Sequence, residues 1–200
     1  MNSWNTVLGT ELEEILDSDG RLDEILPRRR AIYMWKRSYR AKPTCIASPT
    51  EFFKFCESLA ESHAGTWVAR GGNHFIQLVT VELGGSGLTL NQADILKAFL
   101  SQRKNRHWMK TYLESLESMS PSLYVGETGS LPERIEQHMN GTSNFGSEVN
   151  SSAKIEWANL CLYYFDLGEA QPIDEDSPVR KAIEYLSASL TQASMTRRAG

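Results

Sequence analysis

An arginine and a histidine, four residues apart on one predicted helix, offer the clearest chemistry in this 200-residue chain. The helix spans residues 131–140 and follows Tyr124-Val125-Gly126, a run typical of a strand that ends in a turn. Because positions i and i+4 share a helix face, Arg134 and His138 should lie side by side. A guanidinium is always charged and binds a phosphate through two parallel hydrogen bonds. The arginine is therefore a residue type that suits contact with a phosphate.

The helix start and its apolar stripe should hold these two side chains in place. Ser130 and Glu133 have the S-x-x-E spacing of a capping box, which predicts a well-defined first turn. At about 100° per residue, Arg134 and His138 fall beside the apolar stripe, at the border between core and solvent. The stripe consists of Leu131, Ile135 and Met139.

The pattern Y-[IV]-G, a turn and L-x-x-R-x-x-x-H resembles the second half of the GIY-YIG nuclease motif. Ala31-Ile32-Tyr33 resembles the first half. The resemblance implies an α/β (α+β) fold, with a small, mostly antiparallel sheet flanked by helices, and an endonuclease that hydrolyses nucleic-acid phosphodiester bonds. It also implies the site: catalytic Tyr33, Tyr124, Arg134 and His138, a turn at Gly126, and a metal ligand, Glu184, in the last helix.

Each residue type suits a part of this reaction. Hydrolysis of a phosphodiester needs an activated water, a Lewis acid and a cation for the developing charge. Arg134 suits the cation, and Glu184 is a hard oxygen ligand for Mg²⁺ or Mn²⁺. The resemblance implies that Tyr33 is the general base and that Tyr124 positions water or phosphate. His138 could bond the phosphate or relay a proton. Because a phenol has a pKa of about 10, the metal or Arg134 would have to favour phenolate.

Three features depart from the family. Its two tyrosines lie close in sequence, whereas here 124 − 33 gives 91 positions, so residues 43–120 are predicted to be an inserted helix-hairpin-helix segment that sets substrate choice. Tyr112 is nearer to Tyr124, but its surroundings predict a helix, so we favour Tyr33. Glu127 stands where the family often has lysine, and no asparagine follows Glu184. Because lysine and asparagine are missing, a second function stays open: a nucleic-acid-binding module that has lost cleavage activity.

Simpler interpretations also stay open for these residues. Tyr33 could be a core aromatic, and His138 a half-buried helix histidine. Glu184 lies about 120° from the centre of its helix's apolar stripe and could be solvated. Weaker candidates for the metal ligand are Asp166, Glu169 and Asp174. A purely structural or partner-binding domain is a third possible function.

Charge is clustered locally although the net charge is only −4. A run without acids contains Arg28, Arg29, Arg30, Lys36, Arg37, Arg40 and Lys42, and a second cluster contains Arg103, Lys104, Arg106 and Lys110. Such clusters predict contact with phosphates of DNA, with RNA not excluded. Interleaved Trp35, Tyr39 and Trp108 could stack on bases or pack in the core.

Periodicity predicts an N-terminal helical extension at 1–26 and a nuclease-like domain at 27–200 that the segment 43–120 interrupts. Within it we expect a strand at 31–39, a loop at 43–49, a helix from 49, and a hairpin that turns at Gly71-Gly72-Asn73. A helix from 91 should carry the second basic cluster. A loop at 141–152, a central strand at 155–165 and a helix from 178 should follow.

Three scattered cysteines suggest neither a zinc site nor disulfides, and a reducing compartment fits them best. No leader and no run of about 18 apolar residues is recognisable, which predicts a cytoplasmic (intracellular) protein without a membrane partner. One such site cuts one strand, so cleavage of both strands would require a homodimer or successive nicks.

Overall fold

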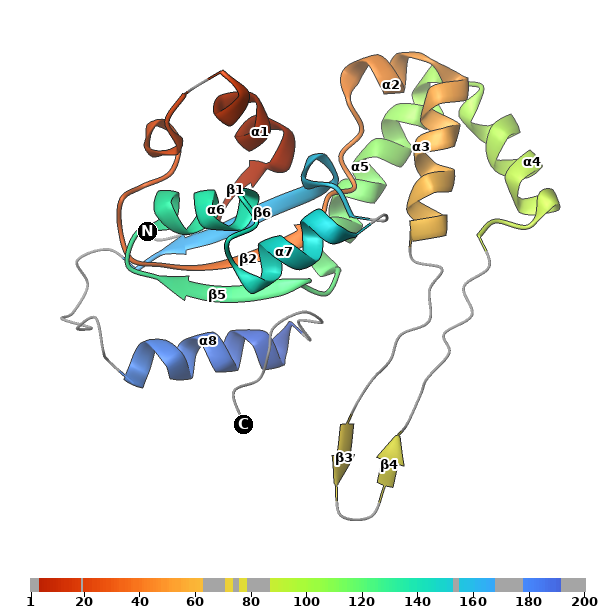
Figure 1. Ribbon diagram of the computed structural model, residues 1–200. Coiled ribbons are helices and arrows are strands. Elements are labelled where there is room, and N and C mark those ends of the chain that lie inside the picture. Colours follow the sequence, from red (N-terminus) through yellow and green to blue (C-terminus); the bar gives the residue numbers. More distant parts are fainter. Residues whose placement is uncertain are drawn as a thin grey trace. The chain divides into compact units, whose positions relative to one another are not determined.

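The computed structural model describes residues 4–18, 20–62, 71–73, 76–78, 87–152, 155–167 and 178–191. It divides the chain into two compact units (Figure 1). Unit 1 comprises residues 1–38 and 117–200, and unit 2 comprises residues 39–116. Unit 2 therefore interrupts unit 1 in sequence, within a few residues of the predicted boundaries. Its origin as an insertion into a known family stays a prediction.

Unit 1 is built on a four-stranded antiparallel sheet with the order β1-β6-β2-β5. The strands are β1 (Asn5–Leu8), β2 (Ala31–Arg37), β5 (Tyr124–Thr128) and β6 (Leu160–Asp166). Strand β2 lies inside the sheet, and Tyr33 faces Gly126 on one side and Tyr164 on the other. All β2 residues except Arg37 are buried, as expected for a strand covered on both faces. The predicted α+β architecture with an antiparallel sheet is confirmed.

Helices cover both faces of this sheet (Figure 1). One face carries α1 (Gly9–Asp17), α6 (Leu131–Met139) and α7 (Asn144–Ser151), and α8 (Pro178–Leu190) covers the other. Because side chains alternate along a strand, Tyr33 and Trp35 enter the larger core under α6 and α7. Ile32 and Met34 enter a smaller core that contains Ala188 of α8.

The N-terminal segment is part of unit 1, so the predicted helical extension at 1–26 is wrong in its organisation. Residues of β1 pair with β6 from Asn5↔Tyr164 to Leu8↔Cys161. Leu12 of α1 and Leu22 of the short 3-10 helix η1 (Leu22–Glu24) are buried in the larger core. A strand of four residues is too short for its alternation to be recognised before the helical pattern begins.

Two predicted loops are helices. Residues 43–47 form α2 (Pro43–Ala47), with proline in the first turn, where its missing N–H costs no hydrogen bond. Within 141–152, α7 begins after Ser143, whose Oγ accepts a hydrogen bond from the Gly146 N–H at 3.0 Å. Phe145 and Val149, one turn apart, are both buried, so a short amphipathic helix forms in a segment of polar appearance.

Unit 2 contains α2, α3 (Pro49–Ser62), α4 (Leu90–Leu100), the first part of α5 (Arg103–Met119) and the antiparallel strands β3 (Gly71–Asn73) and β4 (Ile76–Leu78). The predicted turn Gly71-Gly72-Asn73 is thus strand β3, and the part of the predicted hairpin before it, residues 63–70, lies outside the described residues. The second basic cluster lies on α5, not on the helix from 91, because α4 ends at Leu100. No described helix is both long and apolar enough to cross a membrane.

The chain leaves unit 1 after Ser38 and returns at Glu117, and these two residues are hydrogen bonded to each other. Ser38 Oγ donates to Glu117 Oε2 at 3.3 Å, and Tyr163 Oη donates to Glu117 Oε1 at 2.7 Å. Glu117 is completely buried. A buried carboxylate with two hydroxyl donors therefore joins the two crossing points within unit 1.

Arg106 connects three helices of unit 2. Its guanidinium is buried and donates to carbonyl oxygens at the ends of α2 and α4: Ile46 at 2.7 Å, Leu100 at 2.8 Å, Ser101 at 2.9 Å and Ala47 at 3.3 Å. These carbonyls lack partners within their own helices, and the C-terminal end of a helix attracts a cation. The predicted contact of Arg106 with nucleic acid does not fit its burial, and its role is structural.

Replacing Arg106 by methionine should destabilise unit 2 by about 3 kcal/mol, because buried carbonyls lose a charged donor. Urea unfolding followed by far-ultraviolet circular dichroism measures this loss. Arg103→Met is the matched control, since Arg103 is exposed one turn earlier, and it should change stability by less than about 0.5 kcal/mol. Equal unfolding midpoints for the two variants would contradict the structural role.

Candidate active site

The structure brings Tyr33, Tyr124, Arg134 and His138 together on the face of the sheet that α6 and α7 cover. Tyr33 Oη lies 2.8 Å from His138 Nε2, and Arg134 Nε donates to the same hydroxyl at 3.2 Å. The Tyr124 ring lies 5.3 Å from the His138 ring and 6.0 Å from the Tyr33 ring, between centroids. Residues from β2, β5 and α6 thus form one polar cluster.

Gly126 makes room for this cluster. It is the cross-strand partner of Tyr33, and a Cβ atom built on it would lie 2.5 Å from Tyr33 Oη and 2.8 Å from Tyr124 Cε1. Gly126 lies inside β5 and has no positive φ. The predicted turn role is therefore wrong, and the glycine is required by close approach of the tyrosine hydroxyl.

His138 is completely buried, so its predicted place at the border with solvent is wrong. Its Nδ1 lies 2.5 Å from Ser143 Oγ, at the start of α7. Burial, and then the charge of Arg134, lower the pKa of His138 to about 3, so the imidazole is neutral at neutral pH. One ring nitrogen must then donate and the other accept.

Two hydrogen-bond arrangements satisfy this neutral ring. If Ser143 Oγ donates to Nδ1, then Nε2–H donates to Tyr33 Oη, which also receives Arg134 Nε–H. If Nδ1–H donates to Ser143 Oγ, then Tyr33 donates its proton to Nε2. In both arrangements Ser143 orients the histidine, and the histidine orients Tyr33.

Tyr33 is protonated at neutral pH. Burial and the neighbouring Tyr124 raise its pKa well above the ordinary value of 10, although Arg134 acts in the opposite direction. Partial burial would lower the pKa of Arg134, but Tyr33 and Tyr124 outweigh it and raise that pKa. Arg134 Nη1 also donates to Gln137 Oε1 at 2.9 Å. Within the cluster, Tyr33 is therefore a protonated phenol, His138 a neutral imidazole and Arg134 a permanent cation.

The start of α6 differs from the predicted capping box. Ser130 is the N-cap residue, but its side chain makes no capping bond, and its Oγ is buried without a hydrogen-bond partner. Thr128 Oγ1 instead accepts from the Ser130 N–H at 3.1 Å and donates to the Ser130 carbonyl at 3.0 Å. A threonine at the end of β5 and Pro132 in the first turn thus define where the helix begins.

Glu184 of α8 is half-buried, and charged groups from both faces of the sheet affect its pKa. Burial and the charge of Glu127 raise its pKa, whereas Arg134 and Lys181 lower it. Strand β5 is the edge strand, so groups of α6 and α8 can approach each other around it. Arg134 consequently acts on Tyr33 and on Glu184.

Among the residues that the structure describes, the carboxylates of Glu184 and Glu127 could hold a metal beside this cluster. No group of three or more His, Cys, Asp or Glu suited to a metal occurs among the described residues. Of the weaker candidates, Asp166 pairs with Arg29 at 3.9 Å, and Glu169 and Asp174 lie outside the described residues. Sequence reasoning treated Glu127 only as a lost lysine, because its proximity to Glu184 depends on how α8 packs on β5.

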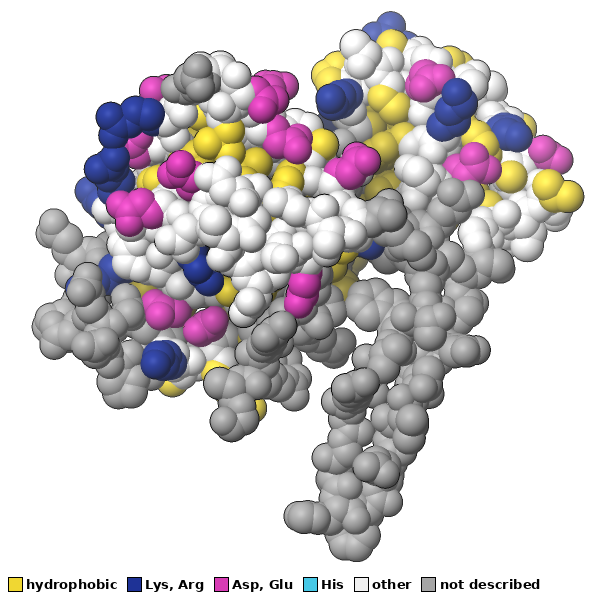
Figure 2. All heavy atoms as spheres, in the orientation of Figure 1, with side chains coloured by type: hydrophobic (Ala, Val, Ile, Leu, Met, Phe, Trp, Pro, Cys, Tyr) yellow, Lys and Arg dark blue, Asp and Glu magenta, His cyan; other side chains and the backbone are white. Residues whose placement is uncertain are grey.

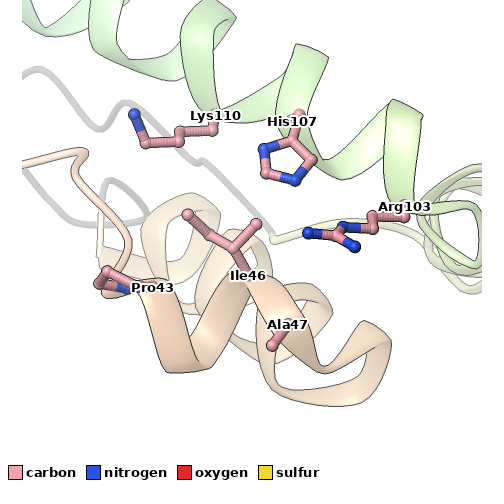
Figure 3. Close-up of a pocket in the computed structure, with 6 residues that line it drawn as sticks. All are labelled: Pro43, Ile46, Ala47, Arg103, His107 and Lys110. Atoms are coloured by element: carbon pink, nitrogen blue, oxygen red, sulfur yellow. The ribbon is translucent and has the colours of Figure 1, made fainter.

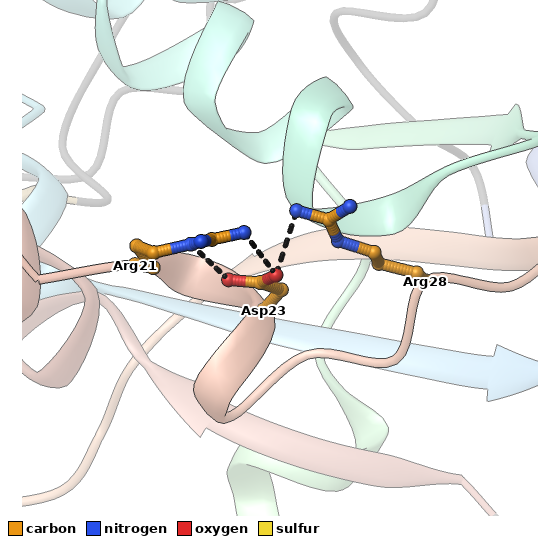
Figure 4. Close-up of polar contacts among 3 residues, drawn as sticks. All are labelled: Arg21, Asp23 and Arg28. Carbon is orange, nitrogen blue, oxygen red and sulfur yellow. Dashed lines mark hydrogen bonds and ion pairs between the residues drawn. The ribbon is translucent and has the colours of Figure 1, made fainter.

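The basic run at 28–42 does not form one continuous track. Arg28 pairs with Asp23 at 2.7 Å, and Asp23 also binds Arg21 at 2.9 Å (Figure 4). Lys36 is buried, and its Nζ donates to the Ser118 carbonyl at 3.0 Å, which does not fit the predicted phosphate contact. In Figure 2, acidic side chains lie beside the basic ones over unit 1.

The other predicted phosphate contacts are divided between the units. Arg28, Arg29, Arg30 and Arg37 belong to unit 1, and Arg40, Lys42, Arg103 and Lys104 belong to unit 2. Arg28, Arg29, Arg40, Lys42, Arg103 and Lys104 are exposed. Trp35 is buried, whereas Trp108 is exposed and stacks on Tyr112 of α5 at 5.4 Å between ring centroids.

Ser143 and Gly146 are site residues that sequence reasoning missed. A Cβ on Gly146 would lie 2.0 Å from the His138 carbonyl oxygen, so only glycine lets α7 approach α6 this closely. The signal was present as a serine followed three residues later by glycine, with Phe145 and Val149 one turn apart. Because this glycine also suits a loop, the segment was predicted to be one.

No protein-family model, no curated protein and no solved structure matches the chain. The roles of these residues consequently rest on their chemistry and geometry.

Gly126→Ala should destabilise the protein by about 1–3 kcal/mol, because the new methyl group overlaps the Tyr33 hydroxyl. Urea unfolding measures this change. Gly129→Ala is the matched control, since a Cβ there meets nothing within 4 Å, and it should be neutral or slightly stabilising. A neutral Gly126→Ala would show that Tyr33 does not occupy this position.

The depressed pKa of His138 should make stability depend on pH. Between its ordinary value of 6.5 and about 3, the unfolded chain binds a proton that the folded chain does not. The contribution of the neutral His138 to the free energy of unfolding is complete above pH 6.5. It is lost as the pH falls, by at most about 1.4 kcal/mol per pH unit. Urea midpoints from pH 7 to 5 should fall less steeply in His138→Gln than in the wild type. The exposed His107→Gln should keep the wild-type slope.

Proposed function

We propose that this chain is a metal-dependent endonuclease of the GIY-YIG type that hydrolyses DNA phosphodiester bonds, with RNA not excluded. One observation carries the proposal: the Tyr33 hydroxyl is shared by Arg134 at 3.2 Å and His138 at 2.8 Å, beside Gly126. The motif predicted these partners from three separate segments. A permanent cation held next to two tyrosines suits a negatively charged substrate.

Arg134 is the group best placed to bind the scissile phosphate. It is only partly buried, and its hydrogen bonds to Tyr33 and Gln137 limit its rotamers. A guanidinium that is already oriented stabilises the charge that develops on the phosphate without reorganising during the reaction. Its raised pKa keeps it cationic throughout.

We assign separate roles in the reaction to Tyr124, His138 and Tyr33. Tyr124 is partly exposed, so its hydroxyl is the one that can position water or phosphate. His138, with a pKa of about 3, is a poor proton acceptor at neutral pH, and its role is to orient Tyr33. When Nε2–H and Arg134 Nε–H both donate to Tyr33 Oη, they favour phenolate once its proton has left.

Glu184, with Glu127 beside it, would hold Mg²⁺ or Mn²⁺. Because Glu127 raises the pKa of Glu184, a divalent cation would relieve the repulsion between these carboxylates. Magnesium is often held by one or two carboxylates and several waters, so this donor set fits it. When bound, the ion would supply Lewis-acid stabilisation of the scissile phosphate.

The second candidate is a nucleic-acid-binding module without cleavage. Tyr33 is fully buried and its pKa is raised, which disfavours a general base, and Glu127 stands where the family often has lysine. In both candidates the three cysteines are free thiols, which fits work in the reducing cytoplasm. If both strands of a duplex are cut, a homodimer or two successive nicks would be needed.

With Mg²⁺ or Mn²⁺, the protein should cut at least one of plasmid, single-stranded or branched DNA or RNA, and EDTA should stop it. Arg134→Ala and Glu184→Gln should each lower the cleavage rate about 10²–10³-fold, because each removes charge stabilisation at the phosphate. Glu136→Gln, an exposed change on α6, is the control and should stay within about twofold. Gel electrophoresis with time measures the rates.

Binding distinguishes the two candidates. Salt-sensitive binding of nucleic acid without cleavage of any substrate would rule out the enzyme and support the binding module. An absence of binding even at low salt would exclude both candidates.

A further inference from the structure

Unit 2 contains a pocket of about 640 Å³ between α2 and α5 (Figure 3). Arg103, His107 and Lys110 of α5 form its basic wall, and Pro43, Ile46 and Ala47 of α2 form its apolar wall. The three basic positions are four and three residues apart, so they share one helix face. All six residues belong to unit 2.

The charge of Arg103 in this pocket is not compensated by any acidic residue that the structure describes. The first turn of α5 contains basic residues and no acidic residue, although the N-terminal end of a helix repels cations. The Arg106 guanidinium donates hydrogen bonds to carbonyls of α2 and α4, and Lys110 forms an ion pair with Glu114 at 2.8 Å. Arg103 is exposed and forms no ion pair with any described residue. The arrangement would be relieved by an anion.

We propose that this pocket binds a phosphate of a nucleic-acid strand, with the attached nucleoside against the apolar wall. The Arg103 guanidinium suits a phosphate, and His107 and Lys110 provide further donors. A wall of proline and aliphatic side chains accepts the less polar sugar and base, as is common in small-molecule sites. This inference rests on the proposed function, because it gives unit 2 the task of holding the substrate.

Lys104 allows a sharp comparison. It carries the same charge as Arg103 and is exposed on the next residue of the helix, but it does not line the pocket. General electrostatic attraction would depend on both residues equally. A site built around the pocket would depend on Arg103.

The experiment measures binding of fluorescein-labelled single-stranded DNA to the full chain in EDTA, by fluorescence anisotropy at several salt concentrations. Arg103→Ala should weaken binding about tenfold and reduce the salt slope by about 0.7. Lys104→Ala should weaken binding less than about twofold. Arg103→Lys should restore part of the loss. Equal circular dichroism spectra and melting temperatures show that the variants fold.

Equal losses in Arg103→Ala and Lys104→Ala, or no loss in either, would overturn the pocket. A glutamate-rich peptide of the same net charge that competes as well as unlabelled DNA would overturn the nucleotide assignment. Loss of binding when the 5′-phosphate is removed supports a strand-end phosphate, and unchanged binding supports an internal one. If DNA binding depends on Arg103 but no substrate is cut, the pocket is supported and the nuclease proposal is excluded. If a substrate is cut but binding does not depend on Arg103, the nuclease proposal is supported and the pocket is excluded.

Discussion

The hydroxyl of Tyr33 is the point on which unit 1 depends. It lies over Gly126 of the neighbouring strand, and it is bonded to Arg134 and His138 of α6. Ser143 holds His138 from the other side, so the position of α7 is linked to the same phenol. A larger residue at position 126, or a shift of α6, would therefore disrupt the contacts of Tyr33, Arg134, His138 and Ser143 at once.

Two opposing demands meet at this phenol. Burial gives Tyr33 and His138 fixed positions, but it also keeps Tyr33 protonated and His138 neutral. A catalytic base must lose its proton, so the same burial that provides the geometry opposes the chemistry. Arg134 acts against this effect of burial, because its charge lowers the pKa of Tyr33.

Elements with a clear period could be predicted from the sequence. Strand β2 and helices α6 and α8 have apolar residues at regular spacing over seven residues or more, and Arg134 and His138 are placed by the helix itself. Strand β1 and helix α7 are short, and tertiary contacts decide their structure. Partners outside the run at 28–42 also escaped prediction: Asp23, shortly before the run, pairs with Arg28, and Asp166, far along the chain, pairs with Arg29. Burial of Lys36 and Arg106 escaped for the same reason.

The bond between Ser38 and Glu117 bears on how such a chain could arise. The two places where unit 2 joins unit 1 are adjacent, so the sheet, its helices and the Tyr33 cluster close without any residue of unit 2. When the two ends of a segment lie close together, its insertion, exchange or deletion in evolution can leave the surrounding fold intact. The sheet and its helices could therefore stay the same in related chains while the segment between residues 38 and 117 changes.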